Sequence, residues 1–192
     1  MRPLRIGVLA LQGAFREHRR ALERCGAEVQ EIRQPLDRSD TEFKGLDSLD
    51  GLVLPGGEST TIGKLLREWD LLDAAVACGR KGMPMYGSCA GLILLSCEIE
   101  GPDGTTLDQP RLGLLDVRVR RNAFGRQVES FETELDVKGV APDLAAVFIR
   151  APFIVSTGAD VDILATVSDA EGTHPVAVRQ GNLLASSFHP EL

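Results

Sequence analysis

Short apolar runs alternate with amphipathic stretches along the first half of the chain. An apolar run bounded by turn residues predicts a buried strand, and apolar positions spaced three or four residues apart predict a helix. Because crossover connections place helices against a parallel sheet, this alternation predicts a three-layer α/β fold: an open, mostly parallel sheet with helices on both faces. The predicted elements are a strand at 5–11, a helix at 14–25, strands at 29–32 and 51–54, helices at 60–68 and 71–78, and a strand at 83–86.

The second half of the chain has a different pattern. Its candidate strands are rich in β-branched residues and are separated by turn signals such as Gln180-Gly181-Asn182. These features predict hairpins and extra antiparallel strands on the same sheet. No repeat, low-complexity tract or linker divides the sequence, so we expect a single domain over residues 1–192. The candidate strands lie at 114–120, 127–137, 162–167 and 175–188.

Charge and hydropathy narrow the classes of function. The formal net charge of −7 disfavours binding to nucleic acid, because capture of a phosphate backbone requires a basic surface. No uninterrupted apolar run approaches the roughly 18 residues that a membrane-spanning helix requires. The first residues lead directly into an apolar strand without a small-residue cleavage site. We therefore expect a cytoplasmic protein that binds neither nucleic acid nor membrane.

The segment Gly87-Ser88-Cys89-Ala90-Gly91 lies between the strand that ends at Tyr86 and an apolar helix predicted at 92–99. This is the setting of a nucleophile elbow, in which small neighbours permit a tight turn and the close approach of a substrate carbonyl. The positive end of the following helix would stabilise a thiolate. Cys89 is therefore the candidate nucleophile, and an inert buried thiol is the alternative interpretation.

A cysteine nucleophile needs a base, and imidazole is suited to this task at neutral pH. His189 directly follows the apolar run 183–188, at a strand end where α/β sheets place their sites. Side chains at i and i+2 of an extended chain share a face, so Glu191 can reach one ring nitrogen of His189 while the other faces Cys89. Pro190 favours the extended conformation at His189.

The other histidines and cysteines are interpreted as structural residues. His18 lies on the first amphipathic helix and is expected to be exposed or at an interface, whereas His174 is expected in a turn. The remaining cysteines lack paired C-x-x-C spacing and are expected to be small apolar side chains. They are Cys25, Cys78 and Cys97.

Cys89 and the terminal His189-Pro190-Glu191 together resemble the catalytic triad of the class I glutamine amidotransferases, which have a flavodoxin-like fold. Further segments are similar to signatures of the glutaminase subunits of pyridoxal phosphate synthases, and the resemblance covers essentially the whole chain. These segments are Leu11-Gln12-Gly13-Ala14 with Glu17-His18, Leu54-Pro55-Gly56-Gly57-Glu58-Ser59-Thr60-Thr61, Arg121-Asn122-Ala123-Phe124-Gly125-Arg126-Gln127, and Phe148-Ile149-Arg150-Ala151-Pro152.

The resemblance implies a role for each matching residue. Cys89 would be the nucleophile, His189 the general acid and base, and Glu191 the group that orients His189. Backbone N–H groups of Gly57 and Ala90 would stabilise the oxyanion. Bound glutamine would be held at its α-carboxylate by an arginine and at its α-ammonium by a carboxylate, although a solvated surface arginine is the alternative for Arg121 and Arg150. The implied glutamine-binding residues are Gly57, Glu58, Ser59, Arg121, Ile149 and Arg150.

The reaction implied by the resemblance is hydrolysis of L-glutamine to L-glutamate and ammonia through a cysteinyl thioester. The implied partner is the synthase subunit, a (β/α) barrel that makes pyridoxal phosphate with the delivered ammonia inside a large hetero-oligomer. The sequence contains no nucleotide-binding loop and no His/Cys cluster with metal-ligand spacing, so no cofactor or metal is expected.

The sequence departs from the family pattern at two places. Ser88 stands where the family more often has threonine, and we expect this difference to be harmless. The printed chain ends at Leu192, so whether Glu191 is firmly held near this terminus stays open on the sequence alone.

Three other functions stay open on the sequence alone. A class I glutaminase could serve another synthase, such as imidazole glycerol phosphate synthase, although the segments at 56–59 and 121–127 count against this. A cysteine peptidase would use the same elbow without a clamp for a small amino acid. A non-enzymatic assembly subunit would keep the fold without turnover.

Overall fold

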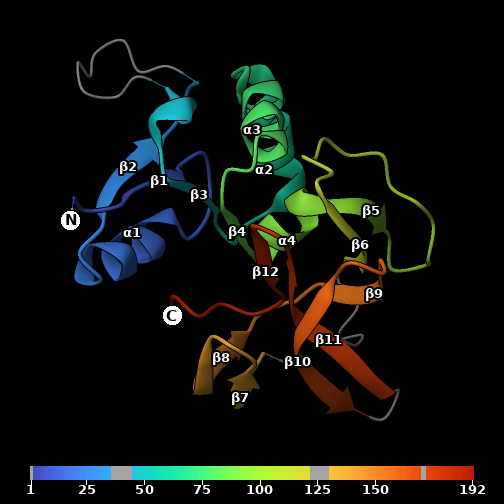
Figure 1. Ribbon diagram of the computed structural model, residues 1–192. Coiled ribbons are helices and arrows are strands. Elements are labelled where there is room, and N and C mark those ends of the chain that lie inside the picture. Colours follow the sequence, from blue (N-terminus) through green and yellow to red (C-terminus); the bar gives the residue numbers. More distant parts are fainter. Residues whose placement is uncertain (1, 36–44, 122–129, 170–171) are drawn as a thin grey trace.

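A seven-stranded sheet forms the centre of the molecule (Figure 1). The computed structural model describes residues 2–35, 45–121, 130–169 and 172–192. The strands β12, β4, β3, β1 and β2 run parallel to one another, and β11 and β10, joined by antiparallel pairing, extend the sheet beyond β12. The prediction of a mostly parallel sheet is confirmed. In spatial order the strands are β10 (Asp162–Asp169), β11 (Gly172–Gln180), β12 (Leu183–Ser186), β4 (Met85–Ser88), β3 (Gly51–Leu54), β1 (Arg5–Leu9) and β2 (Glu28–Ile32).

Helices lie on both sides of this sheet, with α1 on one side and α2 and α3 on the other (Figure 1). Ile62 and Leu66 lie four residues apart on one face of α2, and both are buried in the main apolar core, which also contains Leu54 of β3. Glu58 begins α2 by accepting two backbone N–H groups of its first turn. Within the described ranges, no helix has the length and apolar character needed to cross a membrane. The helices are α1 (Phe15–Arg24), α2 (Ser59–Glu68), α3 (Leu71–Arg80), α4 (Ala90–Leu95) and the 3-10 helix η1 (Leu46–Ser48).

The chain after the nucleophile turn differs from the prediction. The helix expected at 92–99 ends at Leu95, and β5 (Ser96–Glu100) follows without a linker. The Ser96 hydroxyl donates to the carbonyl of Ile93 at 2.8 Å, and the backbone of Ser96 is extended. Cys97 therefore lies on a strand. The helical prediction was wrong here because a short apolar run fits either type of element.

The extra strands of the second half were predicted to lie on the central sheet, but not all of them do. The strands β10, β11 and β12 do so, whereas the others form a three-stranded sheet, β5-β6-β9, and a two-stranded sheet, β7-β8. The prediction was wrong because the alternation of apolar residues identifies a strand but not its partner. Phe148 and Phe188 pack together in a second apolar core beneath the β7-β8 hairpin. These strands are β6 (Leu115–Arg120), β7 (Phe131–Val137), β8 (Ala141–Phe148) and β9 (Phe153–Thr157).

The predicted hairpin at 175–188 is present as β11 and β12, which are joined at 181–182. His174 lies within β11 opposite Val167 of β10, so its interpretation as a turn residue is wrong. Residues 122–129 lie outside the described ranges, so most of the segment that follows Arg121 stays a prediction.

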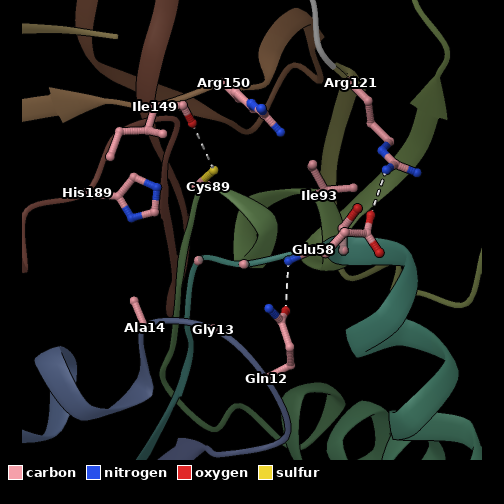
Figure 2. Close-up of a pocket in the computed structure, with 13 residues that line it drawn as sticks. Gln12, Gly13, Ala14, Glu58, Cys89, Ile93, Arg121, Ile149, Arg150 and His189 are labelled. Atoms are coloured by element: carbon pink, nitrogen blue, oxygen red, sulfur yellow. Dashed lines mark hydrogen bonds and ion pairs between the residues drawn. The ribbon is translucent and has the colours of Figure 1, made fainter. Parts of the chain in front are cut away.

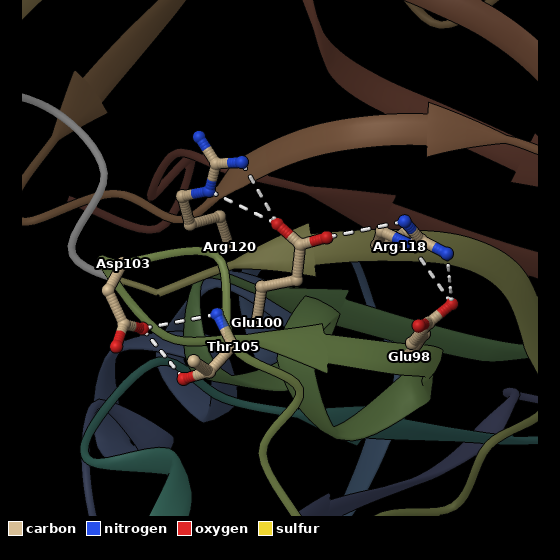
Figure 3. Close-up of polar contacts among 6 residues, drawn as sticks. All are labelled: Glu98, Glu100, Asp103, Thr105, Arg118 and Arg120. Carbon is tan, nitrogen blue, oxygen red and sulfur yellow. Dashed lines mark hydrogen bonds and ion pairs between the residues drawn. The ribbon is translucent and has the colours of Figure 1, made fainter.

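A cluster of charged side chains joins β5 to β6 (Figure 3). Glu100 is buried and accepts hydrogen bonds from Arg118 at 3.4 Å and from Arg120 at 3.0 and 3.2 Å. Arg118 also contacts Glu98 at 2.8 Å. The carbonyl of Glu100 accepts the N–H of Arg121 at 2.9 Å, which fixes the position of Arg121 at the end of β6.

Replacement of Glu100 by glutamine should lower the free energy of unfolding by about 1–3 kcal/mol, because two guanidinium groups lose a charged acceptor. The change should be read as a lower midpoint of thermal unfolding, and the exposed Glu132 of β7, replaced in the same way, serves as the matched control. Equal midpoints for Glu100→Gln and wild type would contradict this account of the cluster.

Candidate functional site

The predicted strand, turn and helix around Cys89 are present. β4 ends at Ser88, and α4 begins directly after Cys89, whose backbone has φ 49° and ψ −100°. A positive φ is strained for a residue with a side chain, and such strain persists only where the surroundings hold it. The N–H of Cys89 donates to the carbonyl of Ser186 in β12 at 2.8 Å. A Cβ atom at Gly91 would lie 2.0 Å from the carbonyl oxygen of Leu54, so α4 reaches β3 only with glycine there.

His189 and Glu191 lie directly behind the nucleophile. The N–H of His189 donates to the carbonyl of Val147 at 2.8 Å, and its Nδ1 lies 2.8 Å from Oε1 of Glu191. The side chains of His189 and Cys89 line the same cavity, and the sulfur of Cys89 lies 4.0 Å from the carbonyl oxygen of Ile149, at the limit for a thiol donor (Figure 2). The side chain of Glu191 is only 1% exposed, so its carboxylate is held in place although it lies near the end of the printed chain.

Two strongly shifted pKa values accompany this geometry. Burial disfavours a charged imidazole, but the hydrogen bonds and charges of Cys89 and Glu191 outweigh it and raise the pKa of His189 to about 10. Burial likewise opposes the ionised form of Glu191, but hydrogen bonds from His18 and His189 lower its pKa to about 2. The surroundings therefore favour the protonated form of the His189 ring and the ionised form of Glu191.

His18 is buried, which makes its prediction as an exposed or interface residue wrong. Its Nε2 lies 2.9 Å from Oγ of Ser88 and 3.3 Å from Oε1 of Glu191. His18 precedes Leu22 by four residues and so lies on the apolar face of α1, the face that packs on the sheet. A polar residue on that face was the signal that sequence reasoning missed.

The other three cysteines do not share one environment. Cys78 is buried, as expected of a small apolar side chain, but Cys25 and Cys97 are exposed. Their exposure corrects the prediction, which had treated all three alike.

A cavity of about 520 Å³ opens in front of Cys89 (Figure 2). It brings together most of the residues that the resemblance implied. Ala90 and Glu191 are not part of the lining, because Ala90 is buried in the first turn of α4 and Glu191 lies behind His189. The predicted residues in the lining are Gly57, Glu58, Ser59, Cys89, Arg121, Ile149, Arg150 and His189; those not predicted are Gln12, Gly13, Ala14, Gly56 and Ile93.

The loop after β1 fixes the backbone of the segment after β3. The carbonyl of Gly56 accepts the N–H of Ala14 at 2.9 Å, and the side-chain carbonyl of Gln12 accepts the N–H of Glu58 at 2.8 Å. Gly13 has φ 97°, and a Cβ atom there would lie 1.9 Å from the oxygen of Gly56. Glycine at position 13 is therefore necessary for the two segments to meet.

Arg121 and Glu58 form an ion pair at the wall of the cavity (Figure 2). The Arg121 guanidinium donates to Oε1 of Glu58 at 2.8 Å, to Oγ1 of Thr60 at 2.7 Å and to Oε1 of Gln109 at 2.8 Å. Burial opposes ionisation of Glu58, but hydrogen bonds from Thr61 and Thr60 and the charge of Arg121 lower its pKa. Gln109 is buried and was not predicted, because it lies in a segment without periodicity.

The segment after β8 brings the remaining predicted residues to the cavity. Arg150 has a positive φ of 46°, and its exposed side chain lies on the same side of the cavity as Ile149 (Figure 2).

Ser59 is buried at the start of α2, and its hydroxyl has no hydrogen-bond partner among the described residues. The cavity thus has an ion pair, a further guanidinium and a thiol on its walls.

Removal of the Cys89 sulfur should lower the pKa of His189. The raised pKa of His189 means that its surroundings favour the protonated ring, and Cys89 contributes to this effect. In Cys89→Ala that contribution is lost, so the titration midpoint of His189 should fall from about 10. The ring Cε1–H signals of the three histidines, followed by NMR against pH, measure this midpoint. A midpoint for His189 that is the same in both proteins would contradict the hydrogen bond to Cys89.

Known proteins match this chain over nearly its full length. A subunit named pyridoxal 5'-phosphate synthase subunit PdxT from Parafrankia sp. (strain EAN1pec) is 58% identical over 98% of this chain and 86% of the relative. The subunit of the same name from Pelotomaculum thermopropionicum is 50% identical over 98% of this chain and 88% of the relative.

Solved structures and a family model agree with this match. A crystal structure described as a glutamine amidotransferase has a TM-score of 0.83 and 49% identity, and covers 97% of this chain and 90% of that one. PurLQS from Thermotoga maritima, with a TM-score of 0.63 and 18% identity over 100% of this chain and 89% of that one, shares the fold. The model of the SNO glutamine amidotransferase family matches residues 8–192. The chain therefore belongs to the SNO glutamine amidotransferase family.

Proposed function

We propose that this chain is the glutaminase subunit of a pyridoxal phosphate synthase and that Cys89, His189 and Glu191 form its catalytic triad. The observation that carries the proposal is one cavity with Cys89 and His189 together in its lining and the Glu58–Arg121 ion pair at its wall. Such a cavity suits a small zwitterion that carries a reactive amide on its side chain. Relatives of at least 50% identity bear the name of this subunit.

In the proposed reaction the thiolate of Cys89 attacks the side-chain carbonyl carbon of glutamine. His189, held as an imidazolium by Glu191, protonates the departing ammonia, and a glutamyl thioester remains on Cys89. His189 then takes a proton from a water molecule, which attacks the thioester and releases glutamate and the free thiol. The hydrogen bond between His189 and Glu191 at 2.8 Å keeps the ring oriented through both steps.

The oxyanion would be stabilised by the N–H groups of Gly57 and Ala90. The carbonyl of Gly56 points to Ala14, and the described peptide bonds are all trans, so the N–H of Gly57 points in the opposite direction. Ala14 and Cys89 lie on opposite sides of this segment, which directs the Gly57 N–H toward the nucleophile (Figure 2). Ala90 begins α4, and the first N–H groups of a helix lack partners within it.

Glutamine would be held by groups whose charge matches its ends. Arg121 or Arg150 would pair with the α-carboxylate and Glu58 with the α-ammonium, so the substrate would exchange partners with the existing ion pair. The buried hydroxyl of Ser59 and the backbone of Gly57 and Ile149 offer further polar contacts. No step in this scheme needs a metal or a cofactor.

The ammonia would pass to the synthase subunit, a (β/α) barrel, inside a cytoplasmic hetero-oligomer, with residues 1–192 acting as one glutaminase domain. The oxyanion segment of Gly56 and Gly57 contains residues with free backbone rotation, which would allow the partner to stabilise its active conformation. We therefore expect low turnover by the isolated chain and stimulation by the synthase subunit.

Substitution of Cys89 by alanine should abolish ammonia release from glutamine, because no thioester can form. Ammonia and glutamate should be measured for wild type and Cys89→Ala, each with and without the synthase subunit, and Cys97→Ala provides the matched control. Release by Cys89→Ala at the wild-type rate would contradict the role of Cys89, and full wild-type activity without the partner would contradict the stimulation.

Substitution of Arg121 by glutamine should raise the KM for glutamine by roughly 10- to 100-fold, the loss expected for one charged hydrogen-bonded contact, with a smaller effect on kcat. The exposed Arg179 of β11, which pairs with Asp162, provides the matched control when replaced by glutamine. An unchanged KM in Arg121→Gln would show that the α-carboxylate binds elsewhere.

A further inference from the structure

A second histidine reaches the triad from the side opposite the nucleophile. His18 contributes Nε2 at 3.3 Å from Oε1 of Glu191, the same oxygen that contacts Nδ1 of His189 at 2.8 Å. Nε2 also lies 2.9 Å from Oγ of Ser88, the residue before the nucleophile. The side chains of His18 and Glu191 are 6% and 1% exposed, so these contacts are shielded from water. The reaction proposed above uses neither His18 nor Ser88.

The contacts of His18 define where its proton lies. An ionised carboxylate only accepts hydrogen bonds, so an Nε2 atom 3.3 Å from Glu191 is favourable only when it carries hydrogen. With that hydrogen on Nε2, the hydroxyl oxygen of Ser88 is the acceptor of the 2.9 Å contact. In this tautomer one hydrogen on Nε2 of His18 lies between the carboxylate of Glu191 at 3.3 Å and Oγ of Ser88 at 2.9 Å.

Ser88 extends the same set of contacts to the oxyanion segment. Its Oγ accepts the backbone N–H of Gly56 at 3.1 Å in a buried position. The carbonyl of Gly56 is bonded to Ala14, so both polar backbone groups of Gly56 are held, one by the residue before the nucleophile and one by the start of α1. The direction of the following N–H, that of Gly57, depends on both anchors.

We propose that His18 and Ser88 act together as positioning residues that tie the oxyanion segment Gly56-Gly57 to the carboxylate of Glu191. Glu191 orients His18 as well as His189, His18 holds the hydroxyl of Ser88, and Ser88 holds the N–H of Gly56. The triad and the oxyanion donor thereby belong to one buried hydrogen-bond network, in which loss of one member loosens the next. The inference rests on the proposed glutaminase function.

The network predicts a specific pattern of kinetic losses. Ser88→Ala should lower kcat for glutamine at least about tenfold, because the oxyanion donor is misplaced, while KM changes little. Ser88→Thr keeps the hydroxyl and should restore most of the turnover lost in Ser88→Ala. His18→Leu should lower kcat in the same direction, and the double variant His18→Leu/Ser88→Ala should lose no more than the larger single loss, since contacts within one network are not additive.

The experiment measures ammonia release against glutamine concentration for the complex with the synthase subunit. Ser168→Ala and His174→Leu, whose side chains lie on β10 and β11 away from the cavity, serve as controls and should keep wild-type kinetics. Alkylation of Cys89 by iodoacetamide, followed by mass spectrometry, reports the reactivity of the sulfur without any oxyanion donor. In the Ser88→Ala variant, Cys89 should be alkylated at a rate within about twofold of the wild-type rate if only the oxyanion segment has moved.

The outcomes separate this inference from the proposed function. Multiplied losses in the double variant, equal losses in Ser88→Ala and Ser88→Thr, or loss of alkylation together with turnover in Ser88→Ala would each overturn the positioning role and leave the glutaminase function standing. Absence of glutamine hydrolysis by the wild-type complex would overturn the proposed function and, with it, this inference.

Discussion

The parallel pairing of β4 with β3 on one side and β12 on the other is the constraint on which the site depends. Its register places Leu54 beside Gly87 and Ser186 beside Ser88, so the three strands end at one level. The segments that follow these strands contain Gly56-Gly57, Cys89 and His189, the residues to which we assign the chemistry. A slip of one strand would move its group away from the other two, and therefore the pairing decides whether the chemistry can occur.

Close packing around this strand edge leaves no room for a larger residue than glycine at two positions. Gly91 lets α4 approach β3, and Gly13 lets the loop after β1 bond to Gly56, in each case because a Cβ atom would overlap a carbonyl oxygen. The charged groups are equally confined, since the carboxylate of Glu191 is shielded from water and contacts two imidazole rings. Steric and electrostatic constraints thus act on the same few residues.

The sequence predicted those parts of the molecule that depend on local pattern. The strand that ends before Cys89, the turn of small residues and the helix after β3 follow from neighbouring residues, and the structure contains all three. The path after Leu95 and the separate β7-β8 sheet depend on pairing partners that are distant in sequence, so local pattern could not identify them. The prediction for His18 was wrong because it used the polar character of histidine on a helix and not the position of His18 on the apolar face of α1.

The central claim is that strand pairing brings one thiol of this chain, and no other, into a glutamine-recognising site with His189. Treatment with a glutamine-like diazo-ketone, followed by peptide mass spectrometry, tests it most directly, because Cys25 and Cys97 are exposed and act as internal references. The account predicts a single adduct on Cys89 that L-glutamine prevents and that His189→Ala does not form. Equal labelling of Cys25, Cys89 and Cys97 without protection by L-glutamine would contradict it.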